Sequence, residues 1–381
     1  MSINQDRGID PQREKGAAVH LGAVRDAFRA CGAEVIAIDE PDEARAWERL
    51  EAARRAGPLT LIYERYALGK SAAAELARRF GVPFVLEVNA PLAEEDLRWR
   101  GRDAGDDEAV RRRDAELFGE ARCVVAVSRD VARYAIRRGA RAERVRVVPN
   151  AVDPRRFRPR APDDTLRRRL VPAGRFAIGF HGRLRPWHGF ELLARAVAKL
   201  LERGAPVHLV LVGHGDFEPM LGMRVPRNCV SAVGWQAHDQ VARYVAAFDA
   251  LPLTYPAELP CYFSPLKLRE AMACAVVPVV PDLGDLASLV GDGHDGLVYP
   301  AGDLDALVAA LERLIGDPAE KDRLGRAARC AAETTTWEDI AALVLAQAGA
   351  GARRPRRRDA PGEAPGPALA ADDASPGMTA R

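Results

Sequence analysis

The stretch CYFSPLKLREAMAC at residues 261–274 places a lysine and a glutamate one helical turn apart. Ser264 and Pro265 are residue types that begin helices, as N-cap and as first helical residue, and strong helix formers follow them. The free N–H groups of such a helix start, together with Lys267, predict an anion site. Glu270 would share a face with Lys267 and could accept hydrogen bonds from a diol such as ribose. The alternative is an ordinary surface pair.

A second candidate lies directly after the apolar run FAIGFHG at residues 176–182. The next letters, RLRPWHG, put Arg183 between a predicted strand and a helix that we expect to begin near His188 or Gly189. An arginine there can bind a diphosphate through two parallel hydrogen bonds, with helix N–H groups adding to it. A plain surface arginine is the alternative. The Gly-His-Gly turn at residues 213–215 would let the backbone approach the same ligand, although such turns are common.

Composition limits the classes of function. The formal net charge of +2 over 381 residues argues against nucleic acid as a partner held by a broad basic field. The six cysteines have no CxxC or metal-ligand spacing, which predicts buried, reduced thiols. No apolar run reaches the ~18 residues that span a bilayer, and no signal-peptide core is visible. We therefore expect a cytoplasmic protein.

The elements that must position these residues follow from an alternation of short β-branched runs and amphipathic stretches, which is typical of βαβ units and parallel sheets. Predicted strands cover residues 33–38, 59–63, 83–88, 123–127, 144–148, 176–182, 207–213, 229–234, 250–255, 276–281 and 296–300. A Pro-, Arg- and Asp-rich stretch divides the two groups of strands. The fold class predicted is α/β, with two Rossmann-like, doubly wound domains.

We expect an N-terminal domain over residues 1–150, a linker over 151–172 and a C-terminal domain over 173–334. A helix at 335–349 would pack back on the N-terminal domain. The tail at 350–381 lacks periodicity and should be disordered. Its arginine cluster could contact an anionic membrane surface peripherally, but a solvated tail is favoured.

The N-terminus departs from this pattern. A Rossmann-like domain opens on an apolar strand, whereas this chain begins MSINQDRGIDPQREKGAAVHL and reaches a predicted helix near Lys15. We expect the first strand to be missing or very short, and the edge of the N-terminal sheet to be compromised.

Six segments resemble, in order and spacing, the C-terminal domain of the retaining glycosyltransferases of family 4, or glycosyl transferases group 1. They are HGRLRPWHGFELLARAVAKL, VHLVLVGHG, VGWQAHDQVARYVAAFDAL, YFSPLKLREAMA, VVPVVPD and GDGHDGLVYPAGDLDALVAALERLI. The segments KGAAVHL, YERYAL, PFVLEVNAPL, VVAVSRDVARY and RVRVVPNAVDPRRF look like the N-terminal domain of the same family. The resemblance implies the GT-B fold, in which two Rossmann-like domains face each other across a cleft.

The resemblance also implies an activity: transfer of a sugar, with retention, from a nucleotide-diphospho-sugar to the hydroxyl of a glycan, lipid-linked or small-molecule acceptor. No metal and no other cofactor are expected, because cationic side chains and helix N-termini would neutralise the leaving diphosphate. Electrostatic stabilisation of that departing charge would dominate catalysis. Closure of the domains about the linker would exclude water.

Carried over residue by residue, the resemblance makes Arg183 a diphosphate ligand and Glu270 a ribose ligand, and Lys267 follows the helix start that meets the phosphates. These three are the predicted catalytic residues. The predicted substrate-binding residues are Gly16, Asn89, His181, Gly182, His188, Gly213, Gly215, Val233, Trp235, Tyr262, Ser264, Pro265 and Leu266.

Within that set, Gly16 matches the family's glycine-rich loop near the acceptor and phosphates, and Asn89 matches an acceptor-side polar residue of many relatives, with Glu87 expected one turn deeper. The segment 233–235 falls where the family reads the nucleobase edge.

Five positions depart from the family pattern, and two of them are Ala275 and Ala151, which replace glycines. Tyr262 replaces the first glutamate of the E-x7-E element that ends at Glu270, and His188 replaces a lysine, so neutralisation would depend on Arg183 and Lys267. Ser288 stands where a sugar-contacting glutamate is usual.

Several alternatives stay open. His20 and His181 are candidate bases, although packing or hydrogen bonding is the favoured role of each. The chain could be a non-catalytic homologue that binds a sugar nucleotide or a partner. An epimerase would need acid/base pairs across the cleft, and a phosphorylase a lysine-bound cofactor; neither pattern is found.

Overall fold

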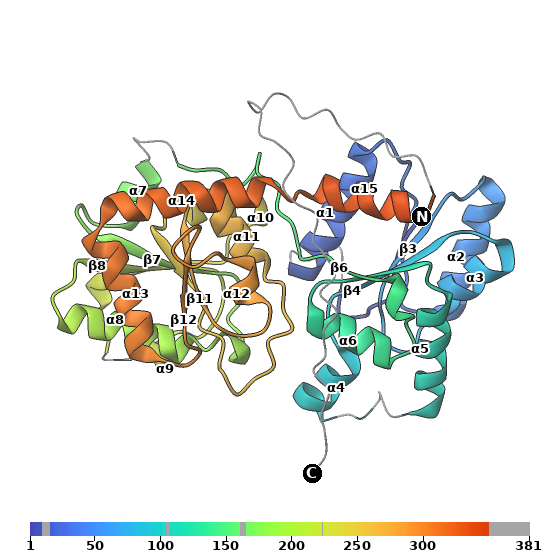
Figure 1. Ribbon diagram of the computed structural model, residues 1–381, viewed down its shortest axis with the longest axis horizontal. Helices are drawn as coiled ribbons and strands as arrows, with labels where there is room; N and C mark the ends of the chain where they lie inside the picture. Colours follow the sequence, from blue (N-terminus) through green and yellow to red (C-terminus); the bar gives the residue numbers. More distant parts are fainter. Residues whose placement is uncertain (10–15, 102, 104–106, 161–164, 223, 350–381) are drawn as a thin grey trace, which may run out of the picture.

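The computed structural model describes residues 1–9, 16–101, 103, 107–160, 165–222 and 224–349. It contains two six-stranded parallel sheets flanked by helices, one in each half of the molecule (Figure 1). The strand orders are β2-β1-β3-β4-β5-β6 and β12-β11-β10-β7-β8-β9. The predicted pair of doubly wound α/β domains is therefore confirmed. The tail at 350–381 and Lys15 lie outside the described residues.

The N-terminal domain carries the first sheet. Its strands are β1 (Ser2–Asn4), β2 (Ala37–Asp39), β3 (Ile62–Arg65), β4 (Phe84–Val88), β5 (Cys123–Ala126) and β6 (Val145–Val147). Its helices are α1 (Gly16–Ala30), α2 (Glu43–Ala56), α3 (Ala72–Phe80), α4 (Leu92–Arg100), α5 (Glu108–Glu120) and α6 (Arg129–Arg137). Each described strand after β1 overlaps a predicted run, because strands buried on both faces read as continuous apolar letters.

The C-terminal domain carries the second sheet. Its strands are β7 (Phe176–His181), β8 (Val207–Val212), β9 (Val230–Gly234), β10 (Ala250–Pro252), β11 (Val277–Pro281) and β12 (Leu297–Tyr299). Its helices are α7 (Thr165–Leu170), α8 (Phe190–Glu202), α9 (Glu218–Leu221), α10 (His238–Val245), α11 (Leu266–Ala273), α12 (Leu286–Leu289), α13 (Leu304–Gly316) and α14 (Pro318–Glu333). A last helix, α15 (Trp337–Gln347), follows.

Of the two expectations for the first strand, a missing strand is wrong and a very short one is confirmed, and the expected compromised sheet edge is wrong. β1 is short, but it lies inside the sheet, paired in parallel with β2 on one side and β3 on the other. The sequence did not reveal β1 because two of its three residues are polar. Their side chains are buried and form hydrogen bonds within the domain. Arg25 Nε donates to Ser2 Oγ at 3.0 Å, and Asn4 Nδ2 donates to the carbonyl of Ile9 at 3.2 Å.

The chain crosses between the domains twice. A single bridge pairs Val152 with Thr336, and after it α15 lies beside α1 on the N-terminal domain while α14 stays on the C-terminal one (Figure 1). Trp337, Ile340 and Val344 of α15 share one apolar core with Val24 of α1. The N-terminal sheet is thus covered on one face by residues from both ends of the described chain.

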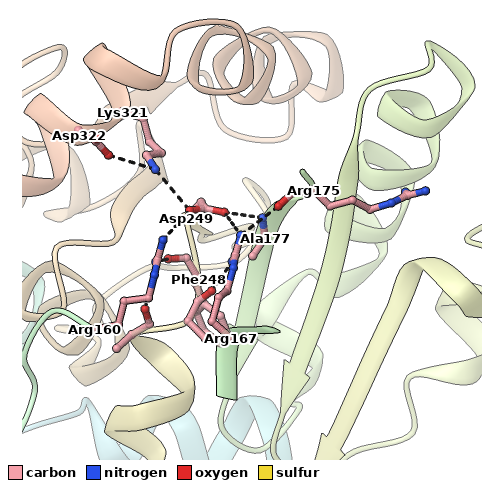
Figure 2. Close-up of polar contacts among 10 residues, drawn as sticks. Arg160, Arg167, Arg175, Ala177, Phe248, Asp249, Lys321 and Asp322 are labelled. Atoms are coloured by element: carbon pink, nitrogen blue, oxygen red, sulfur yellow. Dashed lines mark hydrogen bonds and ion pairs between the residues drawn. The ribbon is translucent and has the colours of Figure 1, made fainter. Parts of the chain in front are cut away.

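A buried carboxylate anchors the linker to the C-terminal domain at the amino-terminal edge of the second sheet. Asp249 Oδ2 accepts hydrogen bonds from the backbone N–H of Ala177 and from Arg167 of α7, both at 2.7 Å. Its Oδ1 lies 3.4 Å from Lys321 Nζ and 3.7 Å from the guanidinium of Arg160 (Figure 2). The linker, α7, β7 and α14 therefore meet at one side chain.

Candidate donor site at the domain junction

The start of α11 lies at the carboxyl edge of the second sheet, but its first residues differ from the prediction. α11 begins at Leu266 with Pro265 as N-cap, and no side chain caps it. Ser264 is not the N-cap, because its Oγ accepts the backbone N–H of Asn150 at 2.8 Å. Asn150 Nδ2 also donates to the Ser264 carbonyl at 2.6 Å. Ser264 therefore ties the helix start to the beginning of the linker.

Lys267 reaches from α11 to the loop after β7. Its Nζ lies 3.2 Å from His188 Nε2 and 4.6 Å from the centre of the Phe180 ring. A Cβ added to Gly182 would lie 4.0 Å from the same Nζ. Burial lowers the pKa of Lys267 to about 8, although the nearby Glu270 opposes the shift. The predicted phosphate ligand is thus a cation with a titration point near neutral pH.

His188 adds no positive charge. Burial, and then the charges of Lys267 and Arg185, lower its pKa to about 2. Its Nδ1 lies 3.1 Å from the backbone N–H of Arg185 and its Nε2 lies 3.2 Å from Lys267 Nζ, and a neutral ring can accept at only one of its two nitrogens. Thr254 Oγ1 donates to the His188 carbonyl at 2.9 Å and holds the loop in place. The next residue must be glycine: Gly189 has φ +58°, and a Cβ there would lie 1.8 Å from the Thr254 carbonyl oxygen.

Glu270 is buried one turn after Lys267. Its Oε1 lies 3.2 Å from His238 Nε2, and its Oε2 lies 3.6 Å from His181 Nε2. Burial alone would raise the pKa of Glu270, but the hydrogen bond from His238 and the charges of His181, His238 and Lys267 lower it overall. Burial lowers the pKa of His181 to about 4. Glu270 is therefore an ionised acceptor with one close hydrogen-bond donor.

Arg183 and the glycines form the neighbouring loops. Arg183 is exposed directly after β7. A Cβ on Gly213 would lie 2.2 Å from the carbonyl oxygen of Gly182, and a Cβ on Gly215 would lie 2.3 Å from Leu184 Cβ. Close packing of the loops after β7 and β8 therefore requires these glycines. That the backbone at Gly213 and Gly215 also approaches a ligand stays a prediction.

A cavity of about 390 Å³ opens beside Glu270, where the two domains meet. It is lined by Ala18, Val19, Gly22, Ala23, Asp26, Ala27 and Ala30 of α1, by residues 151–153 and 155–157, and by His238, Asp239, Leu266, Glu270, Trp337 and Glu338. The predicted nucleobase segment, residues 233–235, lies at the end of β9, where Trp235 is 59% exposed and Val233 is partly buried. Neither residue lines the cavity, whereas the start of α10 does.

On the N-terminal side, a polar group is buried where β3 and β4 end. Glu87 Oε1 lies 2.7 Å from His20 Nε2, and its Oε2 lies 3.7 Å from the guanidinium of Arg65. Despite burial, which would raise it, the pKa of Glu87 falls to about 2 because of His20 and Arg65. Asn89 follows, with a buried Nδ2 that has no hydrogen-bond partner. Gly16 is exposed as the first residue of α1.

Each of the two candidate bases faces a buried carboxylate. His20 contacts Glu87, and its ring meets Trp337 edge to face at 4.8 Å. His181 faces Glu270. The contact with Glu87 favours the hydrogen-bonding role for His20, whereas His181 Nε2, 3.6 Å from Glu270, has no hydrogen-bond partner.

Sequence reasoning missed contacts that join the domains. The Tyr262 hydroxyl donates to Glu95 Oε1 of α4 at 2.5 Å, and Ser128 Oγ donates to the Tyr262 carbonyl at 2.8 Å. One turn along α4, the Trp99 ring lies 5.3 Å from that of Trp187. Only Tyr262 was predicted. The signal that could have directed attention to Glu95 is the tyrosine itself, which needs a partner when buried.

A second interdomain contact lies at the start of α6. The backbone N–H and Nε of Arg129 donate to the two carboxylate oxygens of Asp285, at 2.7 and 2.8 Å. Its guanidinium also donates to Ser288 Oγ at 3.1 Å. Ser288 therefore contacts the N-terminal domain.

Within the described residues, no three His, Cys, Asp or Glu side chains are grouped so that they could hold a metal ion. In the same part of the chain, no helix has both the length and the apolar character needed to cross a bilayer.

Comparison with known proteins identifies the family. Residues 175–317 match the model of the glycosyl transferases group 1, and residues 7–151 match that of the glycosyl transferase 4-like domain. The chain is 30% identical to the D-inositol 3-phosphate glycosyltransferase of Kribbella flavida over 328 residues, which is 80% of this chain and 74% of that one. It is 29% identical to the protein of the same name from Nocardiopsis dassonvillei over 305 residues, 76% and 70% of the two chains.

Solved structures agree with the fold. Sucrose-phosphate synthase of Thermosynechococcus elongatus superposes with a TM-score of 0.71 at 20% identity, covering 91% of this chain and 97% of that one. Anabaena HepE in complex with UDP superposes with a TM-score of 0.70 at 20% identity, covering 91% and 98%. The chain belongs to the group 1, or family 4, glycosyltransferases and has the GT-B fold. It is a glycosyltransferase, and the resemblance seen in the sequence is confirmed.

Proposed function

We propose that this glycosyltransferase transfers a sugar, with retention, from a nucleotide-diphospho-sugar to an acceptor hydroxyl. The observation that carries the proposal is the meeting of Lys267 with the loop after β7, where its Nζ is 3.2 Å from His188 Nε2. Glu270 lies one turn away, beside a cavity of about 390 Å³. A cation next to a carboxylate acceptor suits a diphosphate attached to a ribose. The related structures of Anabaena HepE with UDP and UDP-glucose support a donor of this class.

The chemical role of the site follows from charge. The leaving diphosphate would be bound by Lys267, by the exposed Arg183 and by the N–H groups at the start of α11. His188 is uncharged at neutral pH because its pKa is about 2. Neutralisation of the diphosphate would therefore depend on the positive charges of Lys267 and Arg183. These groups support a mechanism in which side chains, without a metal or other cofactor, stabilise the departing charge.

The acceptor would enter from the N-terminal domain, where Asn89 Nδ2 is buried without a hydrogen-bond partner. Such an atom is costly unless a ligand satisfies it. A glycan, a lipid-linked compound or a small polyol could supply the missing oxygen. The names of the relatives, D-inositol 3-phosphate glycosyltransferases, support a hydroxyl-rich acceptor.

Binding of a panel of nucleotide sugars, measured by thermal shift and calorimetry, tests the donor site. We expect Lys267→Met to weaken binding roughly 30- to 100-fold, because a charge-assisted contact is lost, and Arg183→Ala to weaken it as well. Lys199→Met is the matched control, since Lys199 pairs with Asp305 elsewhere on the surface of the C-terminal domain. Unchanged binding by Lys267→Met would overturn the assignment.

Product analysis separates an enzyme of this mechanism from a non-catalytic binder. Turnover in the presence of an acceptor is expected to give a product with the anomeric configuration of the donor. An inverted product would contradict retention. Binding without turnover across a broad acceptor panel would favour the non-catalytic alternative.

A further inference from the structure

The helix α4 belongs to the N-terminal domain but faces the loops of the donor site. Glu95 accepts the Tyr262 hydroxyl at 2.5 Å, and Trp99, one turn later, lies 5.3 Å from Trp187. Trp187 and Tyr262 lie in the two loops that carry His188 and the start of α11. One face of α4 therefore covers the C-terminal half of the proposed site.

A continuous row of rings links Lys267 to Glu95. Lys267 contacts His188, whose ring centre is 6.1 Å from that of Trp187. Trp187 stacks at 6.2 Å on Phe263, which lies 4.4 Å from Tyr262. Glu95 terminates this row. The sugar of a nucleotide-diphospho-sugar is bonded to the terminal phosphate, so it must lie next to the diphosphate site, at which this row begins.

The charges around Glu95 come from the N-terminal domain, and its hydrogen-bond donor, Tyr262, comes from the other one. Arg65, at the end of β3, and Arg100 attract its carboxylate, while Asp6, just after β1, repels it. Burial raises the pKa of Glu95, and the hydrogen bond from Tyr262 opposes that shift. Its described hydrogen bond occupies Oε1. The carboxyl group is therefore oriented through one oxygen and has acceptor capacity left on the other.

We propose that Glu95 is a specificity-determining residue that accepts hydrogen bonds from hydroxyl groups of the transferred sugar, and that Tyr262 is the positioning residue that holds it at the domain junction. This inference rests on the proposed function. The carboxylate that faces the sugar is thus supplied by the N-terminal domain, so the donor site is complete only when α4 is in contact with the loop at residue 262. The tyrosine that replaces a glutamate in the E-x7-E element then brings in a carboxylate from the other domain.

The test compares two ligands on the same variants: the nucleotide sugar that binds wild type best in the panel, and its parent nucleoside diphosphate. We expect Glu95→Gln to weaken binding of the nucleotide sugar about tenfold while the nucleoside diphosphate binds as in wild type. Tyr262→Phe should weaken sugar-specific binding less, and the double variant should be no weaker than Glu95→Gln, since both act through one carboxylate. Glu94→Gln is the matched control, because Glu94 neighbours Glu95 on α4 and is 54% exposed in its pair with Arg137.

A merely structural role would change the affinities for both ligands together. Equal weakening of the two, or no change in either with Glu95→Gln, overturns the proposal. Additive effects of the two substitutions overturn the positioning role of Tyr262. If wild type binds the nucleoside diphosphate but gains nothing from the attached sugar, the role of Glu95 is overturned while the nucleotide site stands. If wild type binds neither ligand, the proposed function itself has failed.

Discussion

Two buried carboxylates in the C-terminal domain lie near opposite edges of the same sheet and have very different surroundings. Asp249, before β10, has two donors at 2.7 Å and two further cations at 3.4 and 3.7 Å. Glu270, at the carboxyl edge, has one donor at 3.2 Å and a histidine at 3.6 Å. Asp249 has its hydrogen-bonding capacity filled by the protein, whereas Glu270 keeps acceptor capacity beside a cavity. A buried charge that the chain leaves underpaired is better explained by a ligand than by stability.

The largest effect is expected at Asp249, whose role we infer to be structural. The substitution Asp249→Asn leaves Arg160, Arg167 and Lys321 without their shared counter-charge, so we expect a loss of about 3 kcal/mol in the free energy of unfolding. Urea denaturation measures it, and the folded variant should bind nucleotide sugar as wild type does. Asp322→Asn is the control, since Asp322 is 58% exposed and touches Lys321 at the rim of the same cluster. A loss no larger than in that control would contradict the structural role.

The opposite result is expected at Glu270. Glu270→Gln should weaken nucleoside diphosphate binding about tenfold, because a neutral amide is a poorer acceptor for ribose hydroxyls. The free energy of unfolding should change by less than ~1 kcal/mol, since one close hydrogen bond is involved. Calorimetry and urea denaturation supply the two numbers, with the exposed Glu258→Gln as reference. A large loss of stability with unchanged affinity would place Glu270 in the same class as Asp249.

The smallest effect is expected in the pH dependence of nucleoside diphosphate binding, which depends on Lys267 at the carboxyl edge of the sheet. Lys267, with a pKa of about 8 in the free protein, is charged below that pH and neutral above it. A bound diphosphate favours the charged form, so affinity is highest below pH 8 and declines as the pH rises through it. Between pH 7 and 8.5 we expect the Kd of the nucleoside diphosphate to rise about fourfold. Lys267→Met should have a flat profile, and a flat profile in wild type would show that Lys267 does not titrate in this range.

The local pattern of residues 264–270 was enough to predict that a helix begins there. It was not enough to assign its first residues, because Ser264 is taken by Asn150, more than a hundred positions away in sequence. The lowered pKa of His188 could not be read from the sequence for a related reason. Its burial and its contact with Lys267 come from loops that no short-range pattern connects.

The short strand β1 and the role of α4 were also beyond sequence reasoning. The polar letters of β1 are satisfied by Arg25 and by the chain itself, so a strand inside the sheet had no apolar signature. α4 presents Glu95 and Trp99 to the other domain. The pattern of apolar and polar residues along α4 therefore does not reveal this role, because these side chains do not pack into the core of their own domain.

The second crossing of the chain has a practical consequence for domain exchange. Because α15 completes the core over α1, a fragment that ends at residue 150 would expose Val24 and its neighbours to water. A chimaera that joins the N-terminal half of this protein to the C-terminal half of a relative must therefore have two junctions, one near Val152 and one near Thr336, and must carry α15 with the N-terminal domain.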